Sequence, residues 1–343
     1  MSSKKRKESL KNMSSVVTRY AGNPVLSAAD IKYPSSLIFN AGVCKFQNKY
    51  VMVFRNDVGF SAQGKTLEKT YTNLGIAFSD DGVHWTPQDS PWEAPLEMVA
   101  SEEGFRRFYD PRLTVIDGRC YLCFAVDTEA GIRGGIAVTD DFDNFELLSI
   151  SAPDNRNMVL FPEKINDCFF RLERPFPVYG TGGEFFDIWS AASPDCRYWG
   201  DNRLVLSNRD VPFANRKIGP GAPPVKTSAG WLTLFHAVQF HEDKVLDGWE
   251  KVDRPQALWR KEYTAGIMLL DLEDPSKVIA MAKEPLIRAE SECELNGFRG
   301  SVIFPGGMIL EDSGEVKIYY GAADTVECLA TAHVGDLIRF CGK

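Results

Sequence analysis

The feature that most constrains this chain is a short hairpin pattern that recurs along almost its whole length. One kind of unit consists of an apolar run, a polar turn and a second apolar run, and it occurs at residues 42–55, 112–126, 161–175, 222–238 and 306–324. Turn pairs such as Asp117-Gly118 and Ser313-Gly314 separate the two runs, and these residue types favour tight turns between antiparallel strands. Each unit therefore predicts a β-hairpin.

A second kind of hairpin unit follows each unit of the first kind, at residues 74–86, 134–147, 186–200, 265–280 and 329–340. In the first three of these units an aromatic residue follows an acidic turn, namely Trp85, Phe145 and Trp199. Five alternating pairs of hairpins predict five four-stranded sheets, a pattern typical of an all-β, five-bladed β-propeller. A β-sandwich or a mixed α+β pair of domains is the alternative, but neither explains the regular alternation.

The amino-terminal segment is the clearest helix candidate. Residues Lys4 to Arg19 are polar with a few spaced apolar positions. We therefore expect an N-terminal helical extension over residues 1–22, which either packs on a neighbouring subunit of a homo-oligomer or frays. Residues 23–343 are then the propeller domain. The first residues lack the apolar core of a signal peptide, so we expect a cytoplasmic protein with reduced thiols.

Charge and cysteine spacing exclude several classes of function. The chain has 39 Lys and Arg against 47 Asp and Glu, a formal net charge of −8, which argues against a nucleic-acid partner. No apolar run reaches about 18 residues, so no transmembrane helix is predicted. Cys120 and Cys123 have the spacing of a zinc pair, but residues three apart in a strand point to opposite faces. We predict no metal site and no cofactor.

Asp110 is the first polar residue that the strand pattern does not require. It lies in the segment FYDPRL, where Pro111 is expected to push Asp110 towards an extended conformation. Asp110 is a candidate functional residue, with a plain turn aspartate as the alternative. Its neighbour Arg112 is a candidate structural ion-pair partner.

Cationic residues gather in the second half of the sequence. Arg156 and Arg174 bracket one predicted hairpin, and two guanidinium groups that converge on one pocket are costly unless an anion lies between them. The alternative is that they form salt bridges with Glu163 and Glu173. Further along, Lys217 adjoins a loop rich in Gly and Pro, and His236 lies in a predicted strand, where a buried core histidine is the alternative role. Asp324, at the end of the last apolar run, is either a sugar-binding carboxylate or a turn cap.

The motifs resemble those of glycoside hydrolase family 130, the inverting β-mannoside phosphorylases, from about Asn23 to Cys341. They include FNAGV (39–43), YDPRLT (109–114), DNRNMVLFPEKI (154–165), RLERP (171–175), KIGPGAPPVKT (217–227) and IYYGAADT (318–325). FNAGV, RLERP and VPFAN (211–215) resemble in particular the subgroup that acts on 4-O-β-D-mannosyl-D-glucose.

The resemblance implies a five-bladed propeller and a role for each matched residue. Asp110 is the implied general acid. Asn40, Arg55, Tyr109 and Asp324 are the implied substrate-binding residues, and Arg156, Arg174, His236, Lys217 and Tyr263 are implied to surround phosphate. The implied reaction converts 4-O-β-D-mannosyl-D-glucose and inorganic phosphate to α-D-mannose 1-phosphate and glucose, with inversion. The resemblance also implies that the proton from Asp110 passes through a mannose hydroxyl.

The residue set agrees with phosphorolysis on chemical grounds. An inverting hydrolase needs a second carboxylate to activate water, whereas phosphate is already a charged nucleophile that arginines bind and orient. Three alternatives stay open. One is a phosphorylase of β-1,4-mannooligosaccharides; another is a propeller hydrolase with Asp57, Asp127 or Asp324 as its base; the third is a non-catalytic sugar-binding protein.

Overall fold

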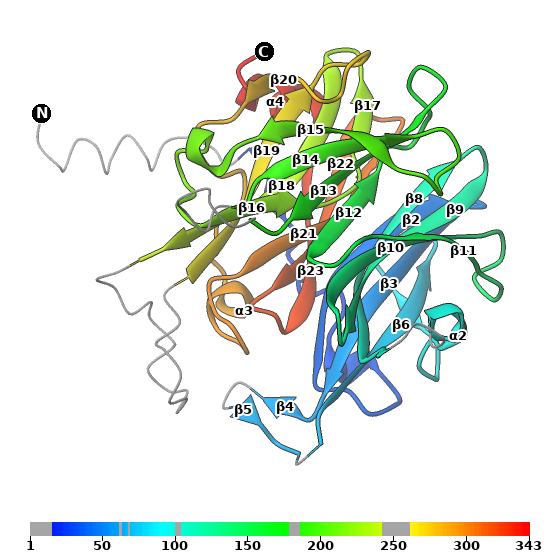
Figure 1. The fold of residues 1–343 in the computed structure, drawn as a ribbon. Coiled ribbons are helices and arrows are strands. Elements are labelled where there is room, and N and C mark those ends of the chain that lie inside the picture. The colour runs from blue at the N-terminus through cyan, green and yellow to red at the C-terminus, as the bar shows by residue number, and fades with distance from the viewer. Residues whose placement is uncertain (1–15, 62–63, 68, 100–103, 178–185, 242–260) are drawn as a thin grey trace, which may run out of the picture.

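The computed structural model describes residues 16–61, 64–67, 69–99, 104–177, 186–241 and 261–343. Strands dominate these residues, which confirms the all-β prediction (Figure 1). The largest sheet has the order β1-β23-β22-β21-β2-β3-β6-β7. Its strands are β1 (Thr18–Arg19), β2 (Leu37–Phe46), β3 (Lys49–Val58), β6 (Tyr71–Ser79), β7 (Thr86–Pro87), β21 (Ile303–Leu310), β22 (Glu315–Ala322) and β23 (Val326–His333).

Three further sheets follow the hairpin pattern of the sequence. The second comprises β8 (Arg107–Ile116), β9 (Arg119–Thr128), β10 (Gly131–Thr139) and β11 (Glu146–Ile150). The third comprises β12 (Asn155–Leu160), β13 (Phe169–Pro175), β14 (Ile188–Ser193) and β15 (Gly200–Leu206). The fourth comprises β16 (Lys217–Pro220), β18 (Gly230–Phe240), β19 (Lys261–Leu270) and β20 (Val278–Met281), with β17 (Val225–Thr227) paired to β18.

Short elements complete the described fold. Strands β4 (Phe60–Ser61) and β5 (Gly64–Lys65) form a small ribbon. The helices are α2 (Ala94–Val99), α3 (Glu292–Leu295) and α4 (Val334–Phe340), with 3₁₀ turns η1 (Ala28–Asp30) and η2 (Asn208–Asp210). Among the described residues, no helix has the length and apolar character needed to cross a membrane.

The sheets differ from the five separate ones that we predicted. The first and fifth predicted sheets are joined by a parallel contact between Val43 in β2 and Gly307 in β21. The hairpin predicted at 329–340 is wrong, because β23 runs directly into α4. The strand that pairs with the outer edge of β23 is instead β1, whose Thr18 pairs with Thr331. The propeller arrangement and the division into domains stay predictions.

The predicted N-terminal helix lies mostly outside the described residues, which begin at Val16. Where the prediction can be compared with the structure it is wrong, because Thr18–Arg19 is a strand. Arg19 extends from this strand to Glu294 of α3, with a distance of 2.8 Å between Nε and Oε1. This segment is therefore fixed by the sheet that it joins.

The acidic turns of the second hairpin units repeat closely in structure. One carboxylate oxygen of Asp81, Asp141 and Asp195 accepts two backbone N–H bonds from the residues two and three positions later, at 2.8–3.0 Å. Such side-chain bonds mimic a backbone turn and stabilise it locally. The repetition that we read from the sequence is thus confirmed as three equivalent turns.

The predicted divergence of Cys120 and Cys123 is confirmed. In β9, Cys120 packs with Cys44 in one apolar cluster, whereas Cys123 packs with Cys196 in another. The two thiols point to opposite faces, as the strand period requires. The described residues contain no group of His, Cys, Asp and Glu arranged to hold a metal ion.

The first strands of the sheets converge on one region near the middle of Figure 1, where β2 contacts β8 and β21, and β12 contacts β8 and β16. Glycines permit the closest approaches. A Cβ on Gly42 would lie 2.8 Å from the Arg112 Cα, and a Cβ on Gly306 would lie 1.9 Å from the Ala41 carbonyl oxygen. Both positions therefore require glycine.

Gly306→Ala is expected to destabilise the protein, because the backbone oxygen of Ala41 cannot move aside as a flexible side chain can. Overpacking of this kind costs about 3 kcal/mol in the free energy of unfolding, measured by urea titration. Gly200→Ala is the control, because nothing lies within 4 Å of a Cβ at that position. Equal stabilities for the two variants would show that β2 and β21 do not approach this closely.

Candidate active site

A cavity of about 250 Å³ lies where the first strands converge. All ten residues that the sequence predicted for the site line it: Asn40, Arg55, Tyr109, Asp110, Arg156, Arg174, Lys217, His236, Tyr263 and Asp324. These residues come from the large sheet and from all three smaller sheets. Residues spread over nearly 300 positions of sequence thus meet in one polar chamber.

Irregular register in the first strands turns functional side chains towards this cavity. The pairing of β8 with β9 shifts between Tyr109 and Arg112, and Asp110 has φ of 52°. The pairing of β2 with β3 shifts between Phe39 and Gly42, and Asn40 has φ of 57°. Bulges re-aim side chains, and left-handed backbone at residues other than glycine is found preferentially at functional sites. The expected extended conformation of Asp110 is therefore wrong.

The side chain of Asp110 is 9% exposed and is held by partners from two neighbouring strands. Its Oδ1 accepts a hydrogen bond of 3.0 Å from Nδ2 of Asn40 and lies 3.5 Å from Nη1 of Arg55. Burial alone would raise the pKa of this carboxyl. The positive charges of Arg55, Arg156 and Arg112, with the bond from Asn40, outweigh burial and lower the pKa below its ordinary value. Asp110 is therefore ionised at neutral pH when no ligand is bound.

Arg112 supports this arrangement from behind. Its guanidinium donates to the backbone carbonyl oxygens of Asn40, Pro111 and Gly221, at 2.6–3.0 Å. These bonds connect both bulges to the fourth sheet. The expected ion-pair role is replaced by a backbone-anchoring role, and the charge of Arg112 still contributes to the low pKa of Asp110.

Arg55 is fixed in place by Asp57 and two aromatic rings. Its Nε and Nη2 donate to the two carboxylate oxygens of Asp57, at 2.8 and 2.6 Å. Its guanidinium carbon lies 4.6 Å from the ring centre of Phe39 and 5.3 Å from that of Tyr109. A bidentate pair of this kind fixes the plane of the guanidinium, so Nη1 stays directed at Asp110.

The opposite part of the cavity is strongly cationic. Arg156, Arg174 and Lys217 gather around His236, and their charges act on one another. Burial and the neighbouring Arg156 lower the pKa of Arg174 to about 9. Burial, Arg174 and Arg156 lower the pKa of Lys217 well below its ordinary value. These groups therefore repel one another, and a bound anion would stabilise them.

His236 is a neutral member of this group. Burial, followed by the charges of Arg174 and Lys217, lowers its pKa well below the ordinary value. Its Nε2 lies 3.1 Å from Nη1 of Arg174, and because a guanidinium only donates, Nε2 is the acceptor and Nδ1 carries the proton. His236 is thus more than a core residue, since it orients Arg174.

Several donors in the cationic part have no partner among the described residues. They are Nε of Arg156, Nε of Arg174 and Nδ1 of His236. An unpaired buried donor costs roughly 1–3 kcal/mol, so three of them in one cavity indicate a bound acceptor. The proposed salt bridges to Glu163 and Glu173 are wrong, because Glu173 pairs with Arg171 and Glu163 pairs with Lys226.

Tyr109 and Tyr263 are buried on the cavity wall, and burial chiefly raises the pKa of each hydroxyl to about 12. Tyr109 donates to Asp127 at 2.7 Å and accepts from Nη1 of Arg156 at 3.3 Å. Tyr263 lies beneath Lys217, whose Nζ is 5.1 Å from the ring centre. Both phenols stay protonated at neutral pH.

Carboxylates are few in the cavity wall. Asp324 lines it and pairs with Arg299 at 2.8 Å, and burial raises the pKa of Asp324. Asp57 and Asp127 do not line it, because they bind Arg55 and Arg107 from outside. Two of the three carboxylates that could act as the base in a water-dependent reaction therefore lie outside the cavity lining.

Sequence reasoning missed two cationic residues of the wall, Arg107 and Arg299. Arg107 could have been found, because it lies two positions before Tyr109 in a strand and therefore on the same face. Arg299 follows α3 in a segment without strand periodicity, where the sequence carries no such signal.

A family model described as beta-1,4-mannooligosaccharide phosphorylase matches residues 4–343 of this chain. A beta-1,2-mannobiose phosphorylase of Listeria innocua is 34% identical over 77% of this chain and 67% of its own length. A beta-1,4-mannooligosaccharide phosphorylase of Ruminococcus albus is 30% identical, over 95% of this chain and 90% of its own. A 4-O-beta-D-mannosyl-D-glucose phosphorylase of Bacteroides fragilis is 26% identical, over 98% and 87% respectively.

The fold is also similar to a solved structure. A beta-1,2-mannobiose phosphorylase from Listeria innocua in complex with beta-1,2-mannobiose superimposes with a TM-score of 0.76 at 25% identity. The superposition covers 95% of this chain and 99% of that chain.

Proposed function

This chain belongs to glycoside hydrolase family 130, and from that premise we propose that it catalyses the reversible phosphorolysis of β-mannosides. The observation that carries the proposal is the set of unpaired buried donors on Arg156, Arg174 and His236 beside one Asn40-bound carboxylate. Such a cavity suits one anion and one sugar. The relatives named above support the reaction class.

In the proposed reaction Asp110 supplies the proton and phosphate is the nucleophile. A phosphate oxygen attacks the anomeric carbon from the face opposite the leaving sugar, and the C–O bond to that sugar breaks. The leaving oxygen takes the proton, directly or through a mannose hydroxyl as the family resemblance implies. The products are α-D-mannose 1-phosphate and the released sugar. Positioning of phosphate by Arg156 and Arg174 contributes by orientation, and the acid contributes roughly 10²–10⁴-fold.

Binding of phosphate would also prepare Asp110 for its role. The carboxyl is ionised in the empty site because Arg55 and Arg156 outweigh its burial. A phosphate dianion on Arg156 offsets that positive charge, so the pKa of Asp110 rises and the proton needed for catalysis is taken up. In this proposal the binding of phosphate and the protonation of Asp110 are therefore coupled.

This coupling predicts a specific pH dependence. The protonated acid is required, so the rate falls as the pH rises through the pKa of Asp110. Two pH series are measured, one at a saturating and one at a limiting concentration of phosphate dianion, and each concentration is held constant across its series. The alkaline loss of activity is expected at a higher pH in the saturating series. An alkaline limb that stays in place or moves to lower pH would contradict the coupling.

Within this reaction we propose 4-O-β-D-mannosyl-D-glucose as the substrate, on the motifs FNAGV, VPFAN and RLERP. The names of the relatives at 30% and 34% identity make β-1,4- and β-1,2-mannosides the competing substrates. The first strands that converge on the cavity from several sheets support a propeller as the arrangement of the domain. Assembly as a homo-oligomer and a cytoplasmic location stay predictions.

Synthesis in reverse tests the substrate. The protein is incubated with α-D-mannose 1-phosphate and, separately, glucose, mannose or N-acetylglucosamine, and phosphate release is measured. We expect glucose to be the best acceptor, with a β-1,4-linked product identified by NMR. A higher rate with mannose would replace mannosyl-glucose by a mannobiose, and no release with any acceptor would contradict the proposed reaction.

A further inference from the structure

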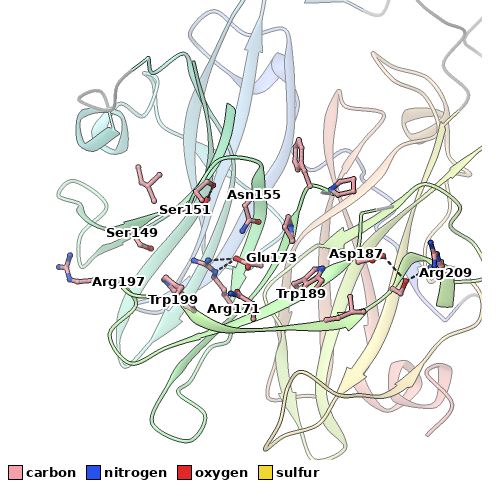
Figure 2. Close-up of a pocket in the computed structure, with 18 residues that line it drawn as sticks. Ser149, Ser151, Asn155, Arg171, Glu173, Asp187, Trp189, Arg197, Trp199 and Arg209 are labelled. Atoms are coloured by element: carbon pink, nitrogen blue, oxygen red, sulfur yellow. Dashed lines mark hydrogen bonds and ion pairs between the residues drawn. The ribbon is translucent and has the colours of Figure 1, made fainter. Parts of the chain in front are cut away.

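A second and larger hollow, of about 850 Å³, lies between the second and third sheets. Figure 2 shows its lining, and we call it the inter-sheet groove. One wall is formed by Glu173 and Trp189 of the third sheet, and the other by Ser149 and Ser151 at the end of β11. Trp199 closes the side that packs against the apolar cluster between the two sheets. This volume is in the range of roughly 300–1,000 Å³ typical of ligand sites.

The inter-sheet groove lies on the face of β13 opposite the catalytic cavity. Arg156 pairs with Arg174 in the ladder and both line the cavity, whereas the adjacent rung, Asn155 with Pro175, lines the groove. Successive residues of a strand point to opposite faces. The groove is therefore a separate site, which β13 separates from the proposed phosphate position.

Two indole rings are exposed to this groove. Trp199 stacks on Arg171, with 4.2 Å from the guanidinium carbon to the ring, and its Nε1 donates to the Cys196 carbonyl at 3.0 Å. Trp189 lies opposite Glu173 and Leu204 in the ladder. Both tryptophans are only partly buried. Rigid indoles offer flat apolar surface at small entropic cost, which suits the apolar face of a sugar ring.

The charged residues of the groove already have partners, unlike those of the cavity. Arg171 pairs with Glu173 at 2.7 Å, and Arg197 pairs with Glu146. Asp187 accepts a bond of 2.6 Å from the backbone N–H of Asn208. The two ion pairs therefore cancel the charges of Arg171, Glu173 and Arg197, and the carboxylate of Asp187 is engaged by the backbone at η2. The hydroxyl and amide groups of the groove fit a neutral ligand that carries many hydroxyls.

We propose that the inter-sheet groove binds a neutral oligosaccharide, with Trp189 and Trp199 as stacking platforms. The ligand is a chain of several sugar units, because the hollow is about 850 Å³ against about 250 Å³ for the catalytic cavity. The choice of a β-mannan chain as that ligand rests on the proposed reaction class, the phosphorolysis of β-mannosides, and not on the disaccharide proposed as its substrate.

Calorimetry of the full-length Asp110→Asn protein with β-1,4-mannohexaose tests this proposal, because the sugar is then not consumed. We expect two binding events, and Trp189→Ala is expected to weaken one of them at least 10-fold. Ala152→Trp is the second variant, since it fills the groove from an exposed position and removes nothing from the core. Tyr198→Ala is the control, because this tyrosine is 77% exposed and lies outside the lining.

Unchanged hexaose binding in both groove variants overturns the proposal. So does a change in sedimentation from oligomer to monomer in Ala152→Trp with sugar binding retained, because the groove is then a contact between copies of this chain. Cellohexaose, tested in parallel, separates the site from the proposed function. Loss of binding to both sugars in the variants supports the groove even if no mannoside is turned over, whereas turnover with unaltered binding supports only the proposed function.

Discussion

Replacement of Asp110 by asparagine is expected to lower kcat for phosphorolysis by roughly 10²–10⁴-fold while leaving the fold intact. The amide keeps the size of the carboxyl and can still bond to Asn40, but it has no proton to give to the leaving sugar. Because a negative charge is removed from beside Arg156, phosphate should bind as tightly as before or more tightly. Steady-state rates and phosphate calorimetry on the same preparation measure both effects.

A matched variant separates this result from a general loss of charge. Asp201→Asn changes an exposed carboxylate in β15 that pairs with Arg203, and its activity should equal that of the wild type. Near-normal rates in Asp110→Asn would remove this residue from the acid role. If Asp324→Asn alone abolished sugar release from the mannoside, and release did not depend on phosphate, the water-dependent alternative would replace the proposal.

The second large effect concerns the buried arginines. Arg174→Met is expected to raise the KM for phosphate by about 10²-fold, because one charge-assisted hydrogen bond contributes roughly 1.5–3 kcal/mol. Since no carboxylate among the described residues forms an ion pair with Arg174 and its charge repels that of Arg156, its removal should not lower the melting temperature in phosphate-free buffer. The stabilisation that phosphate gives to the wild type should disappear.

Arg171→Met, three residues away on the same strand, is the control with the opposite expectation. Arg171 pairs with Glu173 at 2.7 Å, and both are buried. Removal of one partner leaves a buried charge unpaired and costs about 3–5 kcal/mol of stability, whereas the KM for phosphate should not change. If instead Arg174→Met destabilised the empty protein as strongly as Arg171→Met does, the cluster would be structural and not an anion site.

Much of this arrangement could be predicted from the sequence because hairpins are local. Strand, turn and strand are adjacent in the chain, and turn chemistry at positions such as Asp117-Gly118 marks each boundary. The wrong prediction of an amino-terminal helix concerns a long-range contact. The strand Thr18–Arg19 pairs with Thr331 and Ala330, and no pattern near residue 18 indicates a partner more than 300 positions away. The segment of α4 was predicted as a strand for a local reason. It is short, and its few apolar residues fit the period of a strand as well as that of a helix.

The site residues were predictable for a different reason. Asp110, Arg156 and Arg174 are polar groups in segments that would otherwise be continuous strand, so they stand out without any knowledge of contacts. Their geometry was not predictable, because the left-handed conformations of Asn40 and Asp110 occur at two bulges that Arg112 joins through the carbonyls of Asn40 and Pro111, and these bulges are 70 positions apart in the sequence. Arg299 and the inter-sheet groove arise only when separate segments pack together.

The most direct test of the account is the phosphate dependence of sugar release. Purified protein is incubated with 4-O-β-D-mannosyl-D-glucose, and in parallel with β-1,2- and β-1,4-mannobiose, with and without inorganic phosphate. Phosphorus and proton NMR then identify the products. The account predicts α-D-mannose 1-phosphate and free acceptor sugar in equal amounts from at least one mannoside, and no release without phosphate. Release of free mannose at the same rate in phosphate-free buffer would contradict it.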